Sequence, residues 1–382
     1  MTAGPPFRCH AEALARVRTA FEENFSLGRE CGAELSIWQD GREVLHLHRG
    51  HRDSGRSLPW QDDTIVLVWS ATKGPASACV LRALREAGRM PSLPVSHIWP
   101  EFAAAGKRDL TVEDILSHRA GLCAVGDRSV DALDHESVAR ALAAQAPLWS
   151  PRSAHGYGPR AFGYLVEEIV RRLVGIPLGQ FWREAIAGPL GVDFWIGLPG
   201  DIHGRAADVV PPRAAALSGE RTEFERAFAE PGSLTNAAFS TPVGLSGISV
   251  MNTPRVRSAS LPALGGIGSA SALARFYSAV LDGSAGLDVA DLSVRRVNGG
   301  DLVLKLETSF SLGFMLDPTD AGGKIRKTFG PSITAFGHPG AGGSLAFADP
   351  ANGIAFAYVM NQMEPGALPR ERTRRLVNAL YA

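Results

Sequence analysis

The chemistry that this chain can perform is first suggested by a serine and a lysine three residues apart, Ser70 and Lys73. They follow a short apolar run at residues 66–69 and open a stretch whose apolar residues recur with helical spacing. Residues three apart on a helix share a face, so the hydroxyl and the amine can meet. A serine hydroxyl becomes a nucleophile when a base takes its proton, and a lysine is such a base when burial lowers its pKa. The alternative is that Ser70 only caps the helix.

Two further segments place polar side chains in glycine-rich surroundings. Tyr157 lies in a loop rich in Gly and Pro that begins near Trp149 and leads into a predicted helix. His338 lies in Phe-Gly-His-Pro-Gly-Ala-Gly-Gly-Ser, residues 336–344, beside a predicted strand. Glycines this dense beside a strand often allow another group to approach the backbone closely. Taken alone, each segment leaves a packing role for Tyr157 and a structural role for His338 open.

In their order along the chain, these segments resemble the three motifs of the serine β-lactamase and penicillin-binding-protein superfamily. Ser70-x-x-Lys73, Tyr157 and the strand with His338-Pro-Gly look like those motifs, and Leu-Ser-His-Arg-Ala-Gly-Leu at residues 116–122 resembles a segment of class C-like members. Trp-Ser-Pro, His-Gly-Tyr-Gly and Gly-His-Pro-Gly are most similar to the esterase branch, the family VIII carboxylesterases. The likeness extends from the first predicted hairpin to the last predicted helix.

The resemblance implies three catalytic side chains and an oxyanion hole made by two backbone amides. Ser70 would attack the ester carbonyl and become acylated, while Lys73 and Tyr157 would share the proton transfers. Which of these two is the general base stays open. The N–H groups of Ser70 and Ala341 would hold the oxyanion. We expect neither a metal nor a cofactor.

Departures from the penicillin-recognising members narrow the expected substrate. Where those members usually carry Tyr-x-Asn, this chain has Pro159, and His338-Pro replaces their Lys-Thr. A histidine is mostly neutral at pH 7, so the fixed charge that would hold a substrate carboxylate is missing. We therefore predict a serine carboxylesterase of short-chain esters, with at most a weak β-lactamase side activity. His338 and Gly340 are candidates for substrate contact, and so is Trp149, for which core packing is the alternative.

Other functions remain as alternatives. The same Ser-Lys-Tyr site could serve an acyltransferase or an amide hydrolase of the β-lactamase or D-aminopeptidase kind. A non-catalytic binding protein of the same fold is the distant alternative, and a binding module has no need to keep Ser70, Lys73 and Tyr157 together. The Gly-x-Ser-x-Gly elbow of α/β-hydrolases is absent from the sequence.

Composition excludes several classes of partner. Lys plus Arg and Asp plus Glu are both 39 among 382 residues, so the net charge is zero and favours neither nucleic acid nor an anionic membrane. No apolar run approaches the roughly 18 residues that cross a bilayer, and the N-terminus does not read as a signal peptide. The four cysteines form no CxxC pair. We expect a cytoplasmic protein that acts on a small-molecule ester, and the oligomeric state is left open.

The predicted elements fall into an α+β order. Residues 11–25 and 370–381 read as amphipathic helices, and Asp-Gly between two β-rich runs at 31–38 and 43–48 is a strong hairpin signal. Further predicted strands are 302–306, 312–316, 344–348 and 353–360. Several helices are predicted between the hairpin and these strands. Two begin at Ser70 and Thr111, and four more cover 129–146, 160–174, 178–187 and 269–281. The region 199–252 is predicted to be irregular.

These elements predict one antiparallel sheet flanked by the terminal helices, with a mostly helical domain inserted into it. The hairpin would pair with the C-terminal strands. The predicted boundaries are 1–75 and 255–382 for the sheet domain and 76–254 for the inserted domain. The fold class is then α+β and, by the resemblance, β-lactamase/transpeptidase-like, with Ser70 at the junction where clefts form.

Overall fold

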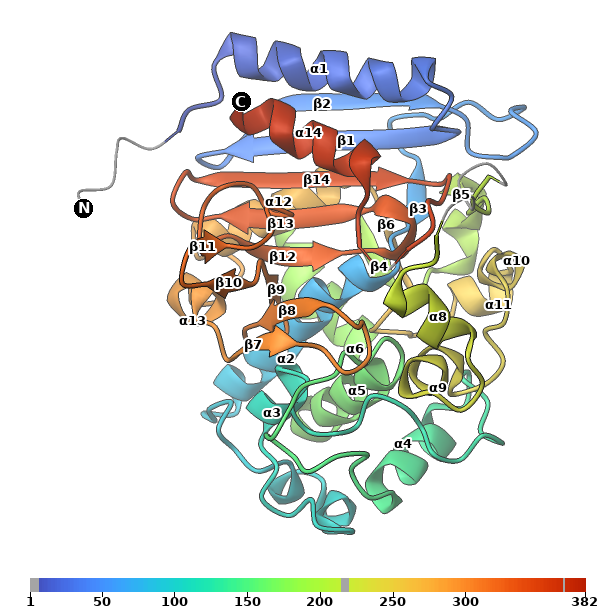
Figure 1. The fold of residues 1–382 in the computed structure, drawn as a ribbon, viewed down its shortest axis with the longest axis vertical. Helices are drawn as coiled ribbons and strands as arrows, with labels where there is room; N and C mark the ends of the chain where they lie inside the picture. The colour runs from blue at the N-terminus through green and yellow to red at the C-terminus, as the bar shows by residue number, and fades with distance from the viewer. Residues whose placement is uncertain (1–6, 214–219, 367) are drawn as a thin grey trace.

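An antiparallel sheet of eight strands forms the centre of the computed structural model, which describes residues 7–213, 220–366 and 368–382 (Figure 1). The strand order is β2-β1-β14-β13-β12-β9-β8-β7. Asp40 and Gly41 join β1 (Gly32–Gln39) to β2 (Arg42–Gly50) with φ angles of 50° and 77°, which a tight hairpin turn requires. β1 pairs with β14 (Ile354–Met360), so the predicted union of hairpin and C-terminal strands is confirmed.

The far edge of the sheet corrects one predicted strand. Residues 302–306 form the turn between two strands, because the Asp301 carboxylate accepts hydrogen bonds from the N–H groups of Val303 and Leu304 (2.8 and 2.9 Å) and bends the chain there. The predicted strand 312–316 shortens to its last two residues. The remaining strands of the sheet are β7 (Val297–Gly300), β8 (Glu307–Phe310), β9 (Met315–Leu316), β12 (Phe336–Pro339) and β13 (Leu345–Asp349).

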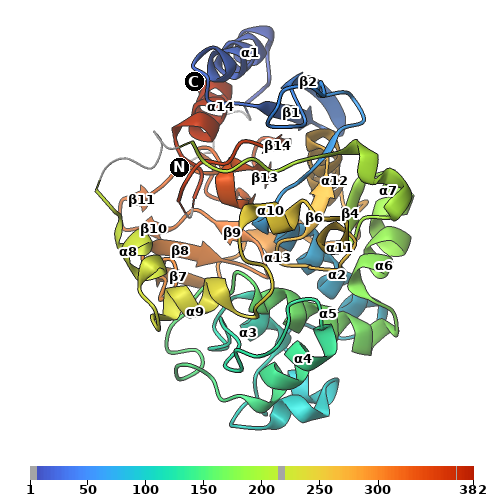
Figure 2. The ribbon, with the colours of Figure 1, turned by 90° about the vertical axis from the view of Figure 1, so that its right-hand side faces the viewer.

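Helices cover both faces of the sheet. The terminal helices α1 (Ala11–Ser26) and α14 (Glu371–Tyr381) pack on one face, and α12 (Ala270–Leu281) packs on the other (Figure 2). Side chains alternate between the two faces, as in β14, where Phe356 packs toward the terminal helices and Ala357 toward α12. All three helices were predicted, and the predicted position of the two terminal helices on the sheet is confirmed.

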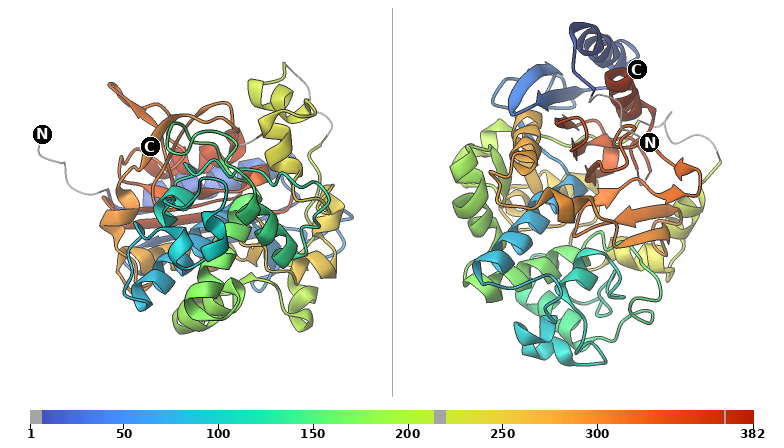
Figure 3. Two further views of the ribbon diagram at one scale, coloured as in Figure 1. Left: turned by 90° about the horizontal axis from the view of Figure 1, so that it is seen from below. Right: turned by 90° about the vertical axis from the view of Figure 1, so that its left-hand side faces the viewer.

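The predicted helical middle lies below the sheet in Figure 1 and is seen from beneath in Figure 3. A helix begins after Thr111, as predicted, and Thr111 forms a reciprocal capping box with Asp114. The helix predicted from residue 129 begins only after Asp134, whose side chain caps it. The helix predicted to stop at Gly188 continues to Leu190 through a π-helical segment, Trp182–Ala187. The helices are α2 (Lys73–Glu86), α3 (Val112–Leu116), α4 (His135–Ala144), α5 (Ala161–Val174), α6 (Leu178–Phe181) and α7 (Gly188–Leu190).

A second sheet and several short helices complete the fold. The sheet has the order β4-β6-β3-β5, with β3 (Ile65–Leu67), β4 (Phe194–Ile196), β5 (Ala206–Ala207) and β6 (Gly266–Gly268). The sequence did not predict it, because its strands are two or three residues long. The remaining elements are α8 (Glu223–Ala229), α9 (Leu234–Ser240), α10 (Ile248–Met251), α11 (Pro254–Arg257), α13 (Val289–Ser293), β10 (Thr319–Asp320) and β11 (Gly323–Lys324).

The region predicted as irregular, 199–252, therefore contains capped short helices, and its residues 214–219 lie outside the described part of the chain. Thr222 and Ser233 cap α8 and α9 by accepting a backbone N–H three residues on. In the described ranges, no helix combines the length and apolar character that crossing a membrane demands. The domain boundaries at 75/76 and 254/255 stay a prediction.

Candidate active site

Ser70 stands at a sharp entry into a helix. β3 runs into residues 68 and 69, and Trp69 has φ 52° and ψ −131°, a conformation that is uncommon for a bulky side chain. A 3₁₀ turn, Ser70–Thr72, follows and leads directly into α2. Ser70 is the first residue of this turn, so its N–H has no acceptor within the turn. Local strain of this kind persists only where the surrounding structure holds it, and it concentrates at functional sites.

Lys73 is fully buried beneath Ser70. Its Nζ lies 3.4 Å from Ser70 Oγ and donates hydrogen bonds to the carbonyl oxygens of Pro159 (3.1 Å) and Ala263 (2.8 Å). The amine also lies 4.7 Å from the centre of the Tyr157 ring. Burial lowers the pKa of Lys73 well below its usual value, and no carboxylate of the described residues opposes that shift. The neutral amine is the form that this environment favours.

The geometry around Lys73 orients a neutral amine toward Ser70. A neutral amine has two N–H donors and one lone pair. The carbonyls of Pro159 and Ala263 accept both donors, which leaves the lone pair for the third neighbour, Ser70 Oγ. The Ser70 hydroxyl can then donate its hydrogen to Lys73 Nζ, which is the arrangement that proton removal from a nucleophile requires.

Tyr157 completes the predicted group of three side chains. Its backbone N–H donates to both oxygens of Asp301 (3.1 and 3.2 Å), and its ring is stacked against Phe310 at 6.0 Å. The phenolic hydroxyl is buried and forms no well-aligned hydrogen bond within the described residues, although it faces Ser70. Burial raises the pKa of Tyr157 above its usual value, and the Ser70 hydroxyl only partly opposes this rise. Tyr157 is therefore held as a phenol.

Two residues that sequence reasoning did not assign hold the Tyr157 segment in place. The buried Asp301 carboxylate binds the Tyr157 N–H as well as its own turn and the Thr308 hydroxyl (3.1 Å). His118 Nδ1 accepts a hydrogen bond from the Gly158 N–H (3.3 Å), and its ring packs against Tyr157. His118 lies in the 116–122 segment that carried part of the family resemblance. Nothing in the sequence marked Asp301.

The predicted oxyanion donors lie on two segments that pack together. Ala341 opens a short 3₁₀ turn after β12, so its N–H, like that of Ser70, has no acceptor within its own turn. Gly340 lies against the segment before Ser70, where an added Cβ would meet the Val68 carbonyl oxygen at 2.1 Å. Arg372 and Thr373 hold the turn from the other side by donating to the carbonyls of residues 342 and 343 (2.6 and 2.7 Å).

His338 and Trp149 behave differently from simple substrate contacts. His338 is buried, and its Nδ1–H donates to the Pro339 carbonyl (2.7 Å). Burial is the largest cause that lowers the pKa of His338 to about 3. The histidine is therefore uncharged at neutral pH. Trp149 donates from Nε1 to the Ala154 carbonyl (3.2 Å), and its ring lies against Gly156. These are packing contacts, and the contact of Trp149 with substrate stays a prediction.

A cavity of about 600 Å³ opens beside the predicted oxyanion hole. Ala341 and Gly342 form part of its wall, and α8 and α9 contribute the opposite wall. The apolar side chains that line it are Phe224, Phe228, Phe239, Ile248 and Met363.

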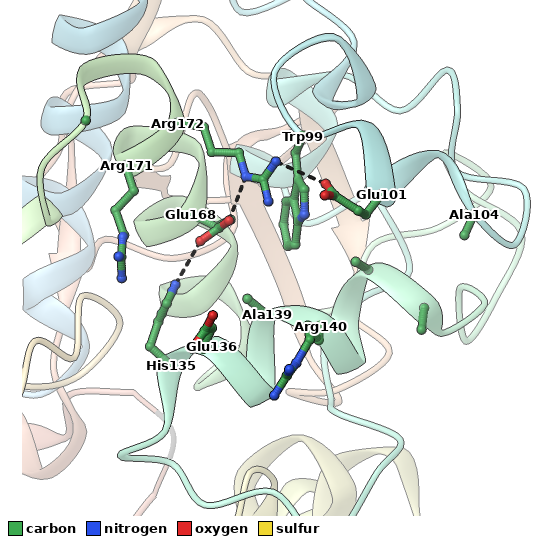
Figure 4. Close-up of a pocket in the computed structure, with 13 residues that line it drawn as sticks. Trp99, Glu101, Ala104, His135, Glu136, Ala139, Arg140, Glu168, Arg171 and Arg172 are labelled. Carbon is green, nitrogen blue, oxygen red and sulfur yellow. Dashed lines mark hydrogen bonds and ion pairs between the residues drawn. The ribbon is translucent and has the colours of Figure 1, made fainter.

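A second cavity, of about 790 Å³, lies between α4 and α5 and is shown in Figure 4. Four of its polar side chains are paired with one another: Glu168 pairs with His135 (3.1 Å) and Arg172 (2.7 Å), and Arg172 also pairs with Glu101 (3.0 Å). None of the predicted catalytic residues lines it. The candidate active site is therefore the Ser70 group with the cavity at Ala341.

Comparisons with known proteins bear on the family of this chain. The family model described as Beta-lactamase matches residues 19–381. Esterase/beta-lactamase LipL of Mycobacterium tuberculosis is 31% identical over 376 residues, which cover 94% of this chain and 82% of that protein. A penicillin-binding protein homologue from Caulobacter crescentus is similar in structure, with a TM-score of 0.84, 37% identity and 99% of both chains covered. A structure described as a family VIII carboxylesterase gives a TM-score of 0.83 with 33% identity over 98% of both chains.

Replacing Gly340 by Ala tests the contact that brings Ala341 toward Ser70. The new Cβ cannot occupy a position 2.1 Å from the Val68 oxygen, so β12 must shift and carry the Ala341 N–H with it. We expect kcat for ester hydrolysis to fall by about a hundredfold, as after loss of one oxyanion donor. Gly200→Ala is the matched control, because nothing lies within 4 Å of its Cβ position. Unchanged kcat in Gly340→Ala would contradict the assignment of Ala341.

Proposed function

The chain belongs to the beta-lactamase family, and from that premise we propose that it is a serine carboxylesterase that cleaves short-chain carboxylic esters through an acyl-enzyme on Ser70. The observation that carries the proposal is the fully buried amine of Lys73, which donates to the carbonyls of Pro159 and Ala263 and lies 3.4 Å from Ser70 Oγ. The likeness to a family VIII carboxylesterase at 33% identity supports the ester as substrate.

Acylation begins with transfer of the Ser70 proton to Lys73 Nζ. The oxygen then attacks the ester carbonyl carbon, and the negative charge that develops on the carbonyl oxygen is stabilised by the N–H groups of Ser70 and Ala341. Preorganised donors of this kind typically supply a factor of about 10² to 10³ in rate each. The proton on Lys73 is not stabilised by a carboxylate, so the ammonium readily gives it up in the next step.

Tyr157 delivers the proton to the leaving alcohol. The phenol gives its proton to the alkoxide oxygen as the carbon–oxygen bond breaks, and Lys73, beneath the Tyr157 ring, restores the phenol. Water then attacks the acyl-enzyme and loses its proton to Lys73, which returns it to Ser70. Lys73 is thus the general base, since the raised pKa of Tyr157 disfavours a phenolate.

The neutral His338 shapes the choice of substrate. With its pKa at about 3, His338 offers no positive charge to a substrate carboxylate at neutral pH, which favours uncharged esters over β-lactams. Hydrolysis of β-lactams is the second candidate, because the relative LipL is described as an esterase/beta-lactamase. Transfer of the acyl group to an alcohol or amine would use the same acyl-enzyme and is distinguished by product analysis.

Replacing Ser70 by Ala tests the nucleophile. We expect p-nitrophenyl acetate hydrolysis to fall by at least about 10³-fold, because no acyl-enzyme can form. Ser26→Ala, which removes a surface hydroxyl bonded to the Glu22 carbonyl, is the matched control. A p-nitrophenyl phosphonate should label Ser70 in intact-protein and peptide mass spectra. Turnover that persists in Ser70→Ala would contradict the proposal. In parallel assays, the wild-type enzyme should hydrolyse nitrocefin much more slowly than the ester.

The pH dependence of kcat/KM distinguishes the two possible bases. The free amine of Lys73 is required, and burial lowers its pKa, so activity falls only as the pH drops below that lowered value. The value of kcat/KM should therefore level off at a pH well below the usual lysine pKa of 10.5 and then stay constant. A Tyr157 phenolate would instead make kcat/KM rise throughout that range, because burial raises the pKa of Tyr157. A steady tenfold rise per pH unit between 7 and 10 would contradict a Lys73 base with a lowered pKa.

A further inference from the structure

We propose that the cavity beside Ala341 binds the acyl group of the ester, and that this group is uncharged, apolar and larger than acetyl. The inference rests on the proposed function of Ser70 and adds to it the class of acid that the enzyme releases. Three independent observations support the inference: the position of the cavity, the chemistry of its surface and the charges at its rim.

The position of the cavity selects the acyl side of the ester. In the tetrahedral intermediate, the former carbonyl oxygen lies at the N–H groups of Ser70 and Ala341, and the alkoxy oxygen must lie near Tyr157 to receive its proton. The remaining substituent is the acyl group. Ala341 and Gly342, on the oxyanion side, form part of the cavity wall, whereas Ser70, Lys73 and Tyr157 do not line it. The acyl group is therefore the part of the substrate that faces the cavity.

The surface of the cavity is built for an apolar group. Phe239 packs edge to face against both Phe224 and Phe228, with ring centres 5.5 Å apart in each pair. Phe228 nevertheless remains 47% exposed, which leaves a large apolar surface open to a ligand. Ile248 and Met363 extend this surface toward Gly342, and a methionine adapts readily to ligands of different shape.

The charges at the cavity rim disfavour an anionic acyl group. Arg370 is paired with Glu225 at 3.0 Å, and Glu364 lies 3.7 Å from the buried Arg372. Three carboxylates, from residues 220, 225 and 364, line the cavity against two guanidinium groups, from residues 221 and 370. A volume of about 600 Å³ is within the range of pockets for small organic ligands and far exceeds what an acetyl group needs.

Two series of uncharged esters test the inference on the full-length enzyme. In the first, p-nitrophenyl esters vary the acyl group from acetyl through butyryl and hexanoyl to phenylacetyl. In the second, acetate esters vary the alcohol from ethyl to hexyl. We expect kcat/KM to rise about fourfold for each added acyl methylene until the cavity is filled, as burial of a methylene predicts, and to change little with alcohol length.

Variants of the cavity wall separate binding from chemistry. Phe224→Ala and Phe239→Ala should abolish most of the gain in kcat/KM from acyl length. Ile333→Ala, which removes an exposed apolar side chain that does not line the cavity, is the matched control and should keep the full acyl series. Thermal unfolding shows whether each variant is folded, and the wild-type series stands even if a variant is not.

The outcomes separate the inference from the proposed function. If wild type hydrolyses p-nitrophenyl acetate well but gains nothing from longer acyl groups, the acyl assignment of the cavity is overturned and the esterase proposal stands. A gain along the alcohol series instead would assign the cavity to the leaving group and also overturn the inference. Absence of turnover with every ester would overturn both.

Discussion

The site depends on a lysine amine that is buried without a carboxylate. Placing an ammonium in such an environment costs several kcal/mol, so the structure favours the neutral amine of Lys73. The neutral amine can accept a proton and therefore act as a base. The fold supplies two backbone carbonyls, from Pro159 and Ala263, that fix the two N–H groups of Lys73. These carbonyls lie far apart in sequence, on the loop before α5 and on the loop before β6. Their meeting at Lys73 links both segments to the start of α2.

The end of the large sheet's strand β12 and the segment that follows β3 meet next to Ser70. β3 and the strained Trp69 deliver Ser70 to the start of its turn, and the end of β12 lies against Val68 because Gly340 has no side chain. On the opposite side, the fully buried Arg372 of α14 holds the Gly342 carbonyl and pairs with Glu30. A terminal helix on the outer face of the sheet thus fixes the turn that carries Ala341. Strain and buried charge of this kind reduce stability and are typical of sites selected for activity.

Features that depend on neighbours in sequence could be predicted. The three-residue spacing of Ser70 and Lys73, the Asp-Gly turn of the hairpin and the capping box at Thr111 each follow from local chemistry, and the structure has all three. The antiparallel union of the hairpin with the C-terminal strands followed from the order of elements. The resemblance to the family then placed Tyr157 beside Lys73, which is the arrangement observed.

Features that depend on distant partners could not be predicted. Residues 302–306 look like a strand, but Asp301 binds the Tyr157 N–H and bends them into a turn. The carbonyls that orient Lys73 carry no side-chain signal. The three phenylalanines of the cavity come from a region that reads as irregular, because its helices are short. The division into two domains at 75/76 and 254/255 remains a prediction.

The charge state of Lys73 is the central claim, and nuclear magnetic resonance of the enzyme with labelled lysine side chains measures it most directly. The other lysines are few, at residues 107, 305, 324 and 327, and Lys→Arg variants at these positions assign the signals. Our account predicts that the Lys73 signal is that of a neutral amine at pH 7 to 8, with a pKa well below the usual 10.5. A Lys73 amine that remains protonated to about pH 10 would contradict it.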